Sequence, residues 1–370
     1  MIAHHARTDV FVIGGGPAGL AAAIAARRRG FSVTVADSAV PPVDKACGEG
    51  IMPDGVAAAR FLGLDLETCG AQHFRGVRFC SGEGSVEASF PNGEGVGMRR
   101  TVLHQLMMDR AADAGVRMMW GARIDGIGAE SVTVDRNTVS TRWIVGADGS
   151  HSAVRRWAGL EACERDGCRY GFRRHYNVAP WSEFMEIHWG EGCQLYVTPV
   201  SASEMCVVLI SRNAHLRLDA ALPRFPELER RLTGSPATSE RGGISASRRL
   251  KAVCRGNVAL VGDASGSVDA ITGEGLCLLF QQSVALAASL ESGDLAQYQA
   301  EHRRIGRRPE MMGDLMLLMD AHTRLRRRTV RALASKPDLF QRLLAWHVGQ
   351  LGVPRALTSG VALGWQILTV

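Results

Sequence analysis

The sequence contains very little lysine. Lys45, Lys251 and Lys336 are the only three, and arginine supplies the rest of the 43 basic residues, which give a formal net charge of +6. Arginine in place of lysine on this scale is typical of a GC-rich genome. We therefore attribute the positive balance to genome composition rather than to a nucleic-acid site, and we expect no nucleic-acid partner.

The sequence also lacks a disulfide or metal-binding pattern. Its nine cysteines are odd in number and scattered, with no Cys-x-x-Cys pair and no Cys/His spacing typical of a zinc site. Free thiols of this kind are typical of a reducing compartment. We predict a cytoplasmic protein without a bound metal.

Long hydrophobic runs are missing as well. The most apolar stretch, residues 276–290, is about 15 residues long and contains Gln281 and Gln282, whereas a membrane-spanning helix needs about 20 apolar residues. Residues 1–8 lead into a predicted strand before a secretory signal could form. We find no repeat and no low-complexity linker, and we expect neither a membrane span nor a signal peptide.

The composition that is present is typical of a folded protein. Hydrophobic residues make up 46% of the chain and charged residues 22%. A chain of 370 residues is longer than one hydrophobic core usually spans. We therefore predict two closely packed domains.

The strongest local pattern is a strand, a glycine turn and a helix near the N-terminus. Residues 9–13 (DVFVI) are predicted to form a buried strand and residues 20–27 (LAAAIAAR) a helix. In the turn between them, Gly16 lets a pyrophosphate approach the backbone and Gly19 lets the helix pack on the strand. Asp37 ends the next predicted strand, where a carboxylate can accept the ribose hydroxyls of an adenosine. The predicted dinucleotide-binding residues of this segment are Gly14, Gly16, Pro17, Ala18, Gly19 and Asp37.

Three later segments narrow the dinucleotide to FAD. They are residues 100–106 (RTVLHQL), 143–155 (WIVGADGSHSAVR) and 256–266 (GNVALVGDASG). In this order and spacing they resemble the flavoprotein superfamily that includes p-hydroxybenzoate hydroxylase-like monooxygenases and geranylgeranyl reductases. The resemblance spans most of residues 8–290 and implies a non-covalently bound FAD.

The resemblance also implies roles for particular residues. Arg100 is expected to reach the FAD pyrophosphate region, Asp148 to stand in a turn near FAD, and Asp263, after Gly262, to hydrogen-bond the ribityl chain. A second glycine turn is absent from the sequence. NAD(P)H, the expected electron donor, would therefore bind transiently in a surface groove.

The implied fold is α/β. It consists of a Rossmann-like FAD-binding domain (GR2 type), an inserted antiparallel-sheet substrate domain and a helical C-terminal region. We assign the FAD-binding domain to residues 1–73, 98–165 and 251–300, the substrate domain to residues 74–97 and 166–250, and the C-terminal region to residues 301–370. Residues 184–189 (FMEIHW) show the alternation of a strand in the substrate sheet.

The segment Lys45-Ala-Cys-Gly-Glu-Gly50 gives the first indication of the reaction. Its Cys-Gly-Glu-Gly run resembles geranylgeranyl reductases, in which a cysteine beside the flavin ring contributes to the site. The thiol of Cys47 could protonate a carbanion after hydride transfer, or it could only shape the pocket. The predicted flavin-facing residues of this loop are Lys45, Cys47 and Gly48.

Residues 262–276 give the second indication. Aromatic hydroxylases of the superfamily usually have His after Gly-Asp-Ala-Ala, whereas the reductases have Gly, and this chain has Gly266. Ala270, in contrast, stands where both branches commonly have Pro. The predicted helix that follows would direct its N-terminus at the flavin pyrimidine edge and stabilise negative charge there. It begins with Gly273, Gly275 and Leu276.

The predicted substrate sheet carries several polar or aromatic candidates for substrate contact. They are His175, Tyr176, Trp181, His188 and Tyr196. A single histidine or tyrosine in a strand is more often structural than catalytic. The candidate catalytic residues are Cys47, Tyr196, His175 and His188.

Two enzymatic reactions stay open. In the favoured one, reduced FAD delivers a hydride to a C=C bond of a lipophilic, isoprenoid- or polyketide-like molecule, with Cys47 or Tyr196 as the proton donor. In the alternative, NAD(P)H reduces FAD, and a C4a-hydroperoxyflavin hydroxylates an aromatic or polyketide substrate, as in secondary metabolism. A third interpretation is a protein that binds flavin but catalyses no reaction.

The C-terminal region raises the question of partners. Residues 324–345 carry seven basic side chains and one acidic side chain. A helix of this kind could lie on an anionic membrane, but a solvated basic face is favoured because Pro337 interrupts the stretch. The apolar tail, residues 361–370, could cover a pocket or a second copy. We expect a monomer or a homodimer with at most a peripheral membrane contact.

Overall fold

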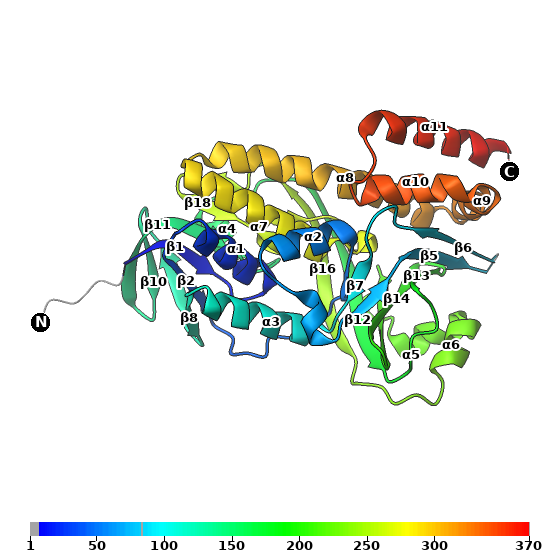
Figure 1. Cartoon of the computed structure of the whole chain (residues 1–370), viewed down its shortest axis with the longest axis horizontal. Coiled ribbons are helices and arrows are strands. Elements are labelled where there is room, and N and C mark those ends of the chain that lie inside the picture. Colours follow the sequence, from blue (N-terminus) through cyan, green and yellow to red (C-terminus); the bar gives the residue numbers. More distant parts are fainter. Residues whose placement is uncertain (1–6, 83, 370) are drawn as a thin grey trace, which may run out of the picture.

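The computed structural model describes residues 7–82 and 84–369. Residues 1–6, on which the expected absence of a signal peptide partly rests, lie outside the described residues. Two large sheets lie side by side along the longest axis of the molecule, and the long helix α8 (Leu295–Ala321) extends across the region where they meet (Figure 1).

The first sheet has eight strands in the order β17-β18-β11-β1-β2-β8, and the hairpin β9-β10 extends it from β11. The strands from β18 to β8 run parallel. Their bounds are β1 (Arg7–Ile13), β2 (Val33–Asp37), β8 (Arg117–Trp120), β9 (Ile124–Ile127), β10 (Ser131–Val134), β11 (Asn137–Gly146), β17 (Cys254–Arg255) and β18 (Val258–Leu260).

The helices around this sheet follow from local sequence. α1 (Pro17–Arg28) is rich in alanine, has proline in its first turn and contacts both the sheet and α7 (Gly275–Ser292). Gly30, in the left-handed conformation with φ 85°, follows its end. The remaining helices of this part are α2 (Pro53–Phe61), α3 (Arg100–Asp113) and α4 (Ala153–Trp157).

The second sheet also has eight strands, in the order β19-β16-β12-β15-β14-β13-β5-β6. All its neighbouring strands are antiparallel except β13 and β5, which run parallel. Their bounds are β5 (Gly76–Ser81), β6 (Gly84–Ser89), β12 (Cys163–Tyr176), β13 (Phe184–Trp189), β14 (Cys193–Ser201), β15 (Glu204–Ser211), β16 (Arg241–Leu250) and β19 (Gly266–Ser267).

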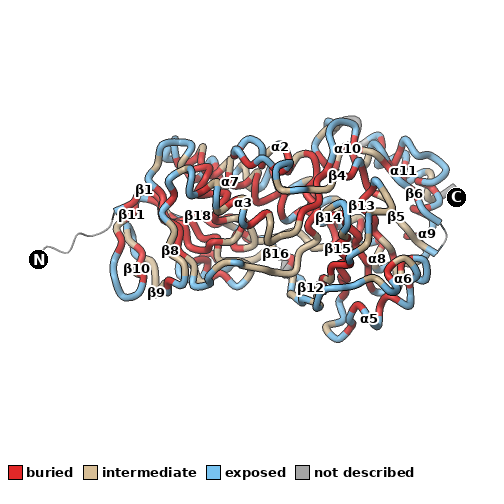
Figure 2. The backbone as a smooth tube through the Cα atoms, turned by 60° about the horizontal axis from the view of Figure 1, so that its bottom comes forward, coloured by how far each residue is buried: buried red, intermediate tan, exposed pale blue. Residues whose placement is uncertain are grey.

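Alternate residues along the strands of the second sheet point to opposite faces and belong to two different hydrophobic clusters. Ile187, Tyr196 and Val208 belong to the main core, together with Phe340 from the C-terminal helices. Residues of the opposite face, such as Val197, pack under α5 (Leu218–Ala221) and α6 (Pro226–Leu232). The predicted alternation of residues 184–189 is confirmed, since the sheet has a covering layer on each face. In Figure 2, β14 and β15 are largely buried, whereas the β9-β10 hairpin carries exposed loops.

A small sheet and several short helices complete this part of the fold. The sheet has the order β3-β7-β4 and sets β3, directly after the Cys47 loop, beside the start of α3. Its strands are β3 (Gly50–Ile51), β4 (Gln72–Phe74) and β7 (Gly95–Gly97). Short 3-10 helices span Leu66–Cys69, Leu222–Arg224, Gly262–Ser265 and Ala270–Thr272.

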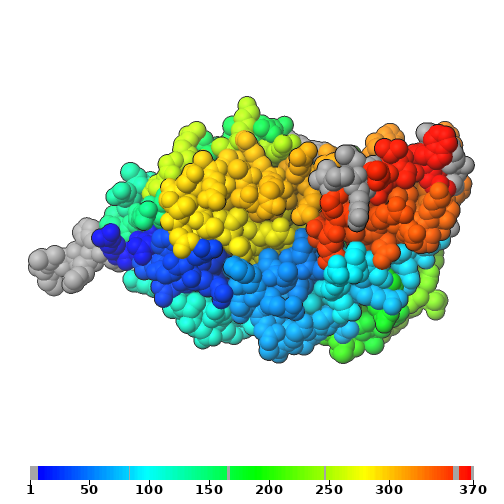
Figure 3. Space-filling model, turned by 45° about the horizontal axis from the view of Figure 1, so that its top comes forward, coloured from blue at the N-terminus to red at the C-terminus, as the bar shows by residue number. Residues whose placement is uncertain are grey.

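The C-terminal region is helical, as predicted. After α8 come α9 (Thr323–Ser335), α10 (Pro337–His347) and α11 (Val353–Thr369), and Pro337 separates α9 from α10. These helices gather at the end of the molecule away from β1 (Figure 3). Among the described helices, none combines the length and the apolar character that crossing a membrane requires.

Behind the end of β18, a buried histidine joins α7 and α8 to the chain at Gly262. Gln282 Oε1 accepts a hydrogen bond from Gly262 N at 2.9 Å, and Gln282 Nε2 lies 3.2 Å from His302 Nε2. Because the amide nitrogen can only donate, His302 Nε2 accepts and is unprotonated. Burial lowers the pKa of His302 from 6.5 to about 4.

We predict that His302 makes the fold sensitive to acid. A histidine with a lowered pKa in the folded state contributes stability above pH 6.5, which is lost as the pH falls toward 4. The difference corresponds to about 3 kcal/mol at most. In urea unfolding as a function of pH, His302→Gln should lose correspondingly less stability over this range than wild type. The exposed His322→Gln should behave as wild type, and identical pH profiles for His302→Gln and wild type would contradict the prediction.

Candidate active site

The parallel strands of the first sheet bring the predicted cofactor residues together. Ile13 pairs with Ala36 and with Gly146, and Gly146 pairs with Leu260, so four strands end at the same edge. The chain segments that leave these ends carry the glycine turn, Asp37, Asp148 and Asp263. In an open α/β sheet, ligands bind at this edge.

A cavity of about 670 Å³ opens at this edge and extends to the second sheet. Most of the predicted site residues line it. They are Gly14, Gly16, Pro17, Ala18, Asp37, Lys45, Cys47, Gly48, Arg100, Asp148, Tyr196, Gly262, Asp263, Gly273, Gly275 and Leu276. Gly19 is not among the lining residues, because it packs inside the turn.

The end of the cavity beside α1 suits a pyrophosphate. Gly16 precedes α1, no side chain caps this helix, and a Cβ atom on Gly16 would have no atom within 4 Å. The first N–H groups of the helix are therefore free for an anion. Arg100 lines the same cavity, and its buried Nε has no hydrogen-bond partner among the described residues.

The carboxylates along the cavity have distinct surroundings. Asp37 Oδ2 accepts a hydrogen bond from Gly15 N at 2.6 Å, so it also holds the glycine turn. Asp148 accepts from Ala153 N at 2.6 Å and Val154 N at 3.1 Å, and so supports the first turn of α4, whose N-cap is Ser152. Asp263 Oδ2 forms an ion pair with Lys45 Nζ at 2.8 Å, and both side chains are partly exposed.

The opposite end of the cavity is formed by the start of α7. Gly273 has φ 70°, and a Cβ atom on Gly273 or Gly275 would meet no atom within 4 Å, so these glycines leave open space. No side chain caps α7. The Tyr196 hydroxyl, fully buried, donates a hydrogen bond to the carbonyl oxygen of Ile271 and so positions the segment before Gly273.

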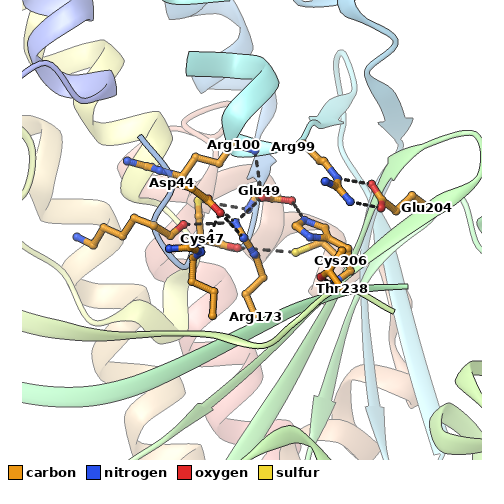
Figure 4. Close-up of polar contacts among 12 residues, drawn as sticks. Asp44, Cys47, Glu49, Arg99, Arg100, Arg173, Glu204, Cys206 and Thr238 are labelled. Carbon is orange, nitrogen blue, oxygen red and sulfur yellow. Dashed lines mark hydrogen bonds and ion pairs between the residues drawn. The ribbon is translucent and has the colours of Figure 1, made fainter. Parts of the chain in front are cut away.

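The loop that carries Cys47 is fixed by a buried carboxylate. Glu49 is 1% exposed and has φ 61°, a left-handed conformation that glutamate rarely adopts. Its Oε1 lies 3.0 Å from Arg173 Nη1 and its Oε2 lies 2.6 Å from His175 Nε2. Oε1 also accepts a hydrogen bond from Arg100 N at 3.0 Å. Figure 4 shows Glu49 between the Cys47 loop, the start of α3 and the second sheet.

Arg173 extends this network along the loop. Its guanidinium donates to both carboxylate oxygens of Asp44, at 2.9 Å and 2.8 Å. Burial would raise the pKa of Asp44, but the hydrogen bond and positive charge of Arg173 outweigh it and lower that pKa. The loop is thus tied to β12 at both Asp44 and Glu49.

The structure does not bring every candidate catalytic residue to the cavity. Cys47 and Tyr196 line it. His175 lies behind the loop, bound to Glu49, and His188 lies 2.9 Å from Glu186 on the opposite side of the sheet, where its ring meets Phe225. The candidate substrate contacts Tyr176 and Trp181 belong to that second cluster as well.

The sequence analysis missed the residues that hold the site in place. Besides Glu49, they are the partners Asp44 and Arg173, and Arg169, whose Nε lies 2.7 Å from Asp269 Oδ1. Arg169 is 1% exposed and joins β12 to the loop before Gly273. The sequence does contain a sign of such residues, namely charged side chains within a strand-like segment. Charged side chains on a buried strand need partners of opposite charge.

Within residues 7–82 and 84–369, three groups of mixed His, Cys and acidic residues lie close enough to hold an ion. They are Glu49, His175 and Cys206; Cys80, Glu186 and His188; and Asp54, Glu274 and Cys277. One carboxylate in each group already has an ion-pair partner: Glu49 has Arg173, Glu186 has Arg78 and Glu274 has His347. A protein without a bound metal stays a prediction.

The cavity fits FAD on three observations. The helices α1 and α7 both begin at the cavity without a capping side chain, Arg100 lines it and has a buried Nε without a partner among the described residues, and Gly48, Gly273 and Gly275 leave open space. These groups suit a pyrophosphate at α1 and the flavin pyrimidine at α7.

We predict that alanine substitutions at two glycines of the turn have different effects, one on folding and one on FAD binding. A Cβ atom on Gly19 would lie 1.8 Å from Gly14 O, so Gly19→Ala should lower the free energy of unfolding by about 1–3 kcal/mol. Gly16→Ala has free space and should fold normally, but its methyl group would keep a pyrophosphate from the backbone. The dissociation constant of FAD, measured by fluorescence titration, should rise about tenfold, or ~1.4 kcal/mol. Unchanged FAD affinity in Gly16→Ala would contradict the assignment.

Comparison with known proteins identifies relatives of two kinds. The chain is 29% identical over 318 residues to the menaquinone reductase of Mycobacterium tuberculosis, with 78% of each protein covered. It is 30% identical over 351 residues to the FAD-dependent urate hydroxylase of Klebsiella pneumoniae, covering 83% of this chain and 87% of the relative. It is 25% identical over 332 residues to the digeranylgeranylglycerophospholipid reductase of Methanocella arvoryzae, covering 80% and 82%.

Solved structures share the whole fold. A flavoprotein/dehydrogenase from Cytophaga hutchinsonii superimposes with a TM-score of 0.83 at 17% identity, and 98% of each chain is covered. A geranylgeranyl bacteriochlorophyll reductase-like protein from Thermoplasma acidophilum has a TM-score of 0.75 at 19% identity, again over 98% of each chain. The predicted α/β fold class is confirmed.

A family model described as an FAD binding domain matches residues 7–213, more than half of the chain. This range includes the glycine turn, Arg100, Asp148 and most of the second sheet. The chain therefore belongs to this family of FAD-binding proteins, and it is an FAD-dependent oxidoreductase.

Proposed function

We propose that the protein transfers a hydride from reduced FAD to a C=C bond of a lipophilic, isoprenoid- or polyketide-like molecule. The observation that carries the proposal is the position of Cys47, which lines the cavity together with apolar residues of the second sheet. The names of two relatives, a menaquinone reductase and a digeranylgeranylglycerophospholipid reductase, support the same class of substrate.

The sheet side of the cavity suits an apolar ligand. Val208, Ile210 and Ile244 line it, and Ile244 is 47% exposed. Gly171 and Gly243 are paired across β12 and β16 and also line the cavity, so the wall carries no side chain at this point. An exposed apolar surface inside a cavity favours a lipophilic partner.

Bound FAD in its reduced form would supply the hydride, and the chain would supply the proton. Cys47 Sγ lies 3.4 Å from Glu49 N, and Cys47 is partly exposed in the cavity, so solvent or a substrate can reach it. Tyr196 is a weaker candidate for the proton donor, because its hydroxyl is already bonded to Ile271 O and burial raises its pKa. We therefore assign the proton to Cys47 and a positioning role to Tyr196.

Hydroxylation is the second candidate. The urate hydroxylase relative matches slightly more of the chain than the menaquinone reductase does. The cofactor cavity serves both reactions, since a helix N-terminus at the pyrimidine edge stabilises reduced flavin in either case. An aromatic or polyketide substrate and NAD(P)H as electron donor belong to this candidate.

The partners also stay proposals. Val361 and Trp365, four residues apart on α11, are 76% and 68% exposed, and the neighbouring α9 exposes Arg324 and Arg328. An apolar face beside arginines suits peripheral contact with an anionic membrane, where lipophilic substrates reside. We also propose that the protein is a monomer or homodimer, that NAD(P)H is its electron donor and that it is located in the cytoplasm.

We predict that reduced enzyme hydrogenates an isoprenoid chain. The purified protein would be reduced with dithionite without oxygen and mixed with a menaquinone that carries a geranylgeranyl chain. The expected product is heavier by two hydrogen atoms and keeps this mass after exposure to air, since a reduced quinone ring would reoxidise whereas a saturated C=C bond would not. Mass spectrometry measures the difference.

The reaction of the reduced protein with oxygen tests the alternative, hydroxylation. Mixing reduced enzyme with oxygenated buffer, with and without a candidate aromatic substrate, should return oxidised flavin in one absorbance step. A resolved transient species together with an oxygenated product would contradict alkene reduction and support hydroxylation.

We predict that Cys47→Ala retains flavin but loses turnover. General acid catalysis contributes roughly 10²–10⁴-fold, so the rate of alkene reduction should fall by at least ~100-fold while FAD affinity stays unchanged. Cys69→Ala, at a cysteine of similar exposure outside the cavity lining, should react as wild type. Full activity of Cys47→Ala would exclude its role as the proton donor.

A further inference from the structure

Directly behind the start of α7 lies a group of titratable side chains that the proposed reaction does not use. Glu274 stands between Gly273 and Gly275, which both line the cavity, but its own side chain is only 1% exposed. His347, the last residue of α10, has its Nε2 2.7 Å from Glu274 Oε1. Asp54, from the first turn of α2, completes the group.

The contacts of Asp54 leave one of its oxygens available. Oδ2 accepts a hydrogen bond from Gln281 Nε2 at 2.7 Å, whereas the buried Oδ1 has no partner among the described residues. The buried Nδ1 of His347 likewise has none. Unpartnered buried oxygen and nitrogen atoms are unfavourable unless a proton or a ligand completes them.

Two carboxylates of this group share one buried cation. With Asp54 and Glu274 ionised and His347 protonated, two negative charges face one positive charge in a largely buried space. The other groups that face it are the thiol of Cys277, which lies beside Met52 N at 3.3 Å, and Arg308 of α8, whose positive charge acts on His347. Glu274 itself lines the cavity, and a carboxylate oxygen of Asp54 lies within 4.8 Å of one of Glu274, so the two carboxylates adjoin the end of the cavity that suits the flavin pyrimidine.

The pKa shifts in this group support Asp54 as the residue that gains and loses a proton. Burial, together with the negative charge of Glu274, raises the pKa of Asp54 to about 6. Burial alone would lower the pKa of His347, but the adjacent Glu274 carboxylate outweighs it and raises that pKa. These directions favour a charged His347 and make Asp54 the group closest to exchanging a proton near neutral pH.

We propose that Asp54, Glu274 and His347 form a proton-binding site that takes up one proton when negative charge appears on the flavin in the adjoining cavity and releases it when that charge disappears. The inference requires FAD binding, but it does not require either of the reactions considered above. It makes the C-terminal helix α10 part of the electrostatic environment of the flavin, although α10 itself contributes no residue to the cavity lining.

The step balances as follows. Dithionite, or NAD(P)H, gives two electrons to the flavin, which takes one proton itself and gains one negative charge. A second proton, from solvent, forms an O–H bond on the Asp54 carboxylate, which becomes a neutral carboxylic acid. Reoxidation of the flavin breaks this bond and returns the proton to solvent. Asp54 is only partly buried as a residue, so solvent can reach it.

We predict that flavin reduction in this protein takes up two protons at neutral pH. The reduction equilibrium would be measured against a redox dye with dithionite, from about pH 7 to about pH 8, where Asp54 is largely ionised before reduction, without substrate. In wild type, the equilibrium constant should fall about 100-fold per pH unit, because each proton contributes a factor of ten. In Asp54→Asn it should fall only about tenfold per pH unit. His347→Gln should also show the tenfold slope, since without its cation the site already holds the proton before reduction.

Asp338→Asn is the matched control, because Asp338 is an exposed carboxylate in the first turn of α10. It should keep the 100-fold slope. A 100-fold slope in Asp54→Asn would overturn the proposal and place the second proton on the flavin itself. A tenfold slope in wild type would overturn it as well.

A second measurement detects the carboxylic acid in the wild-type protein directly. The infrared difference spectrum of reduced minus oxidised wild-type protein should contain a carboxylic acid C=O band that shifts in D₂O and that is lost in Asp54→Asn. A wild-type spectrum without this band would contradict proton uptake at a carboxylate. Both experiments use dithionite and no substrate, so their outcome is independent of whether the enzyme reduces alkenes or hydroxylates aromatics.

Discussion

The site depends on one buried carboxylate. Glu49 adopts a left-handed backbone conformation, and its side chain is held by Arg173, by His175 and by the backbone N–H of Arg100. A single buried charge without partners would be strongly unfavourable, so Glu49 depends on these contacts. They fix the Cys47 loop against the second sheet and against α3 at once, and therefore set the width of the cavity where flavin and substrate would meet.

The same principle operates at the other end of the cavity. Arg169 and Tyr196 extend from the second sheet to Asp269 and Ile271, and in this way position the loop before α7. The second sheet thus holds both loops that line the cavity. Besides these buried polar contacts, one continuous hydrophobic core joins the two sheets.

The family relationship identifies an FAD-dependent oxidoreductase but does not decide between alkene reduction and hydroxylation. The chain belongs to a family with an FAD binding domain and has both reductases and a hydroxylase among its relatives. The cavity contains groups that suit FAD in either reaction: a glycine turn, two helix N-termini and an arginine. It is also lined by Cys47 and by the paired glycines of β12 and β16, and the charged group of Asp54, Glu274 and His347 lies beside it.

The sequence by itself determined the features that depend on neighbouring residues. The glycine turn with its strand and helix, the strand of residues 184–189 and the break at Pro337 all follow from local sterics and periodicity, and the structure has them where they were expected. Only the tertiary structure decided that Glu49 meets Arg173 and His175, more than a hundred residues away, and that Glu274 meets His347. It also placed His188 on the far side of the sheet. Ion pairs of this kind have no period and no fixed spacing in the chain, since they arise where separate elements pack and each buried charge must find a partner.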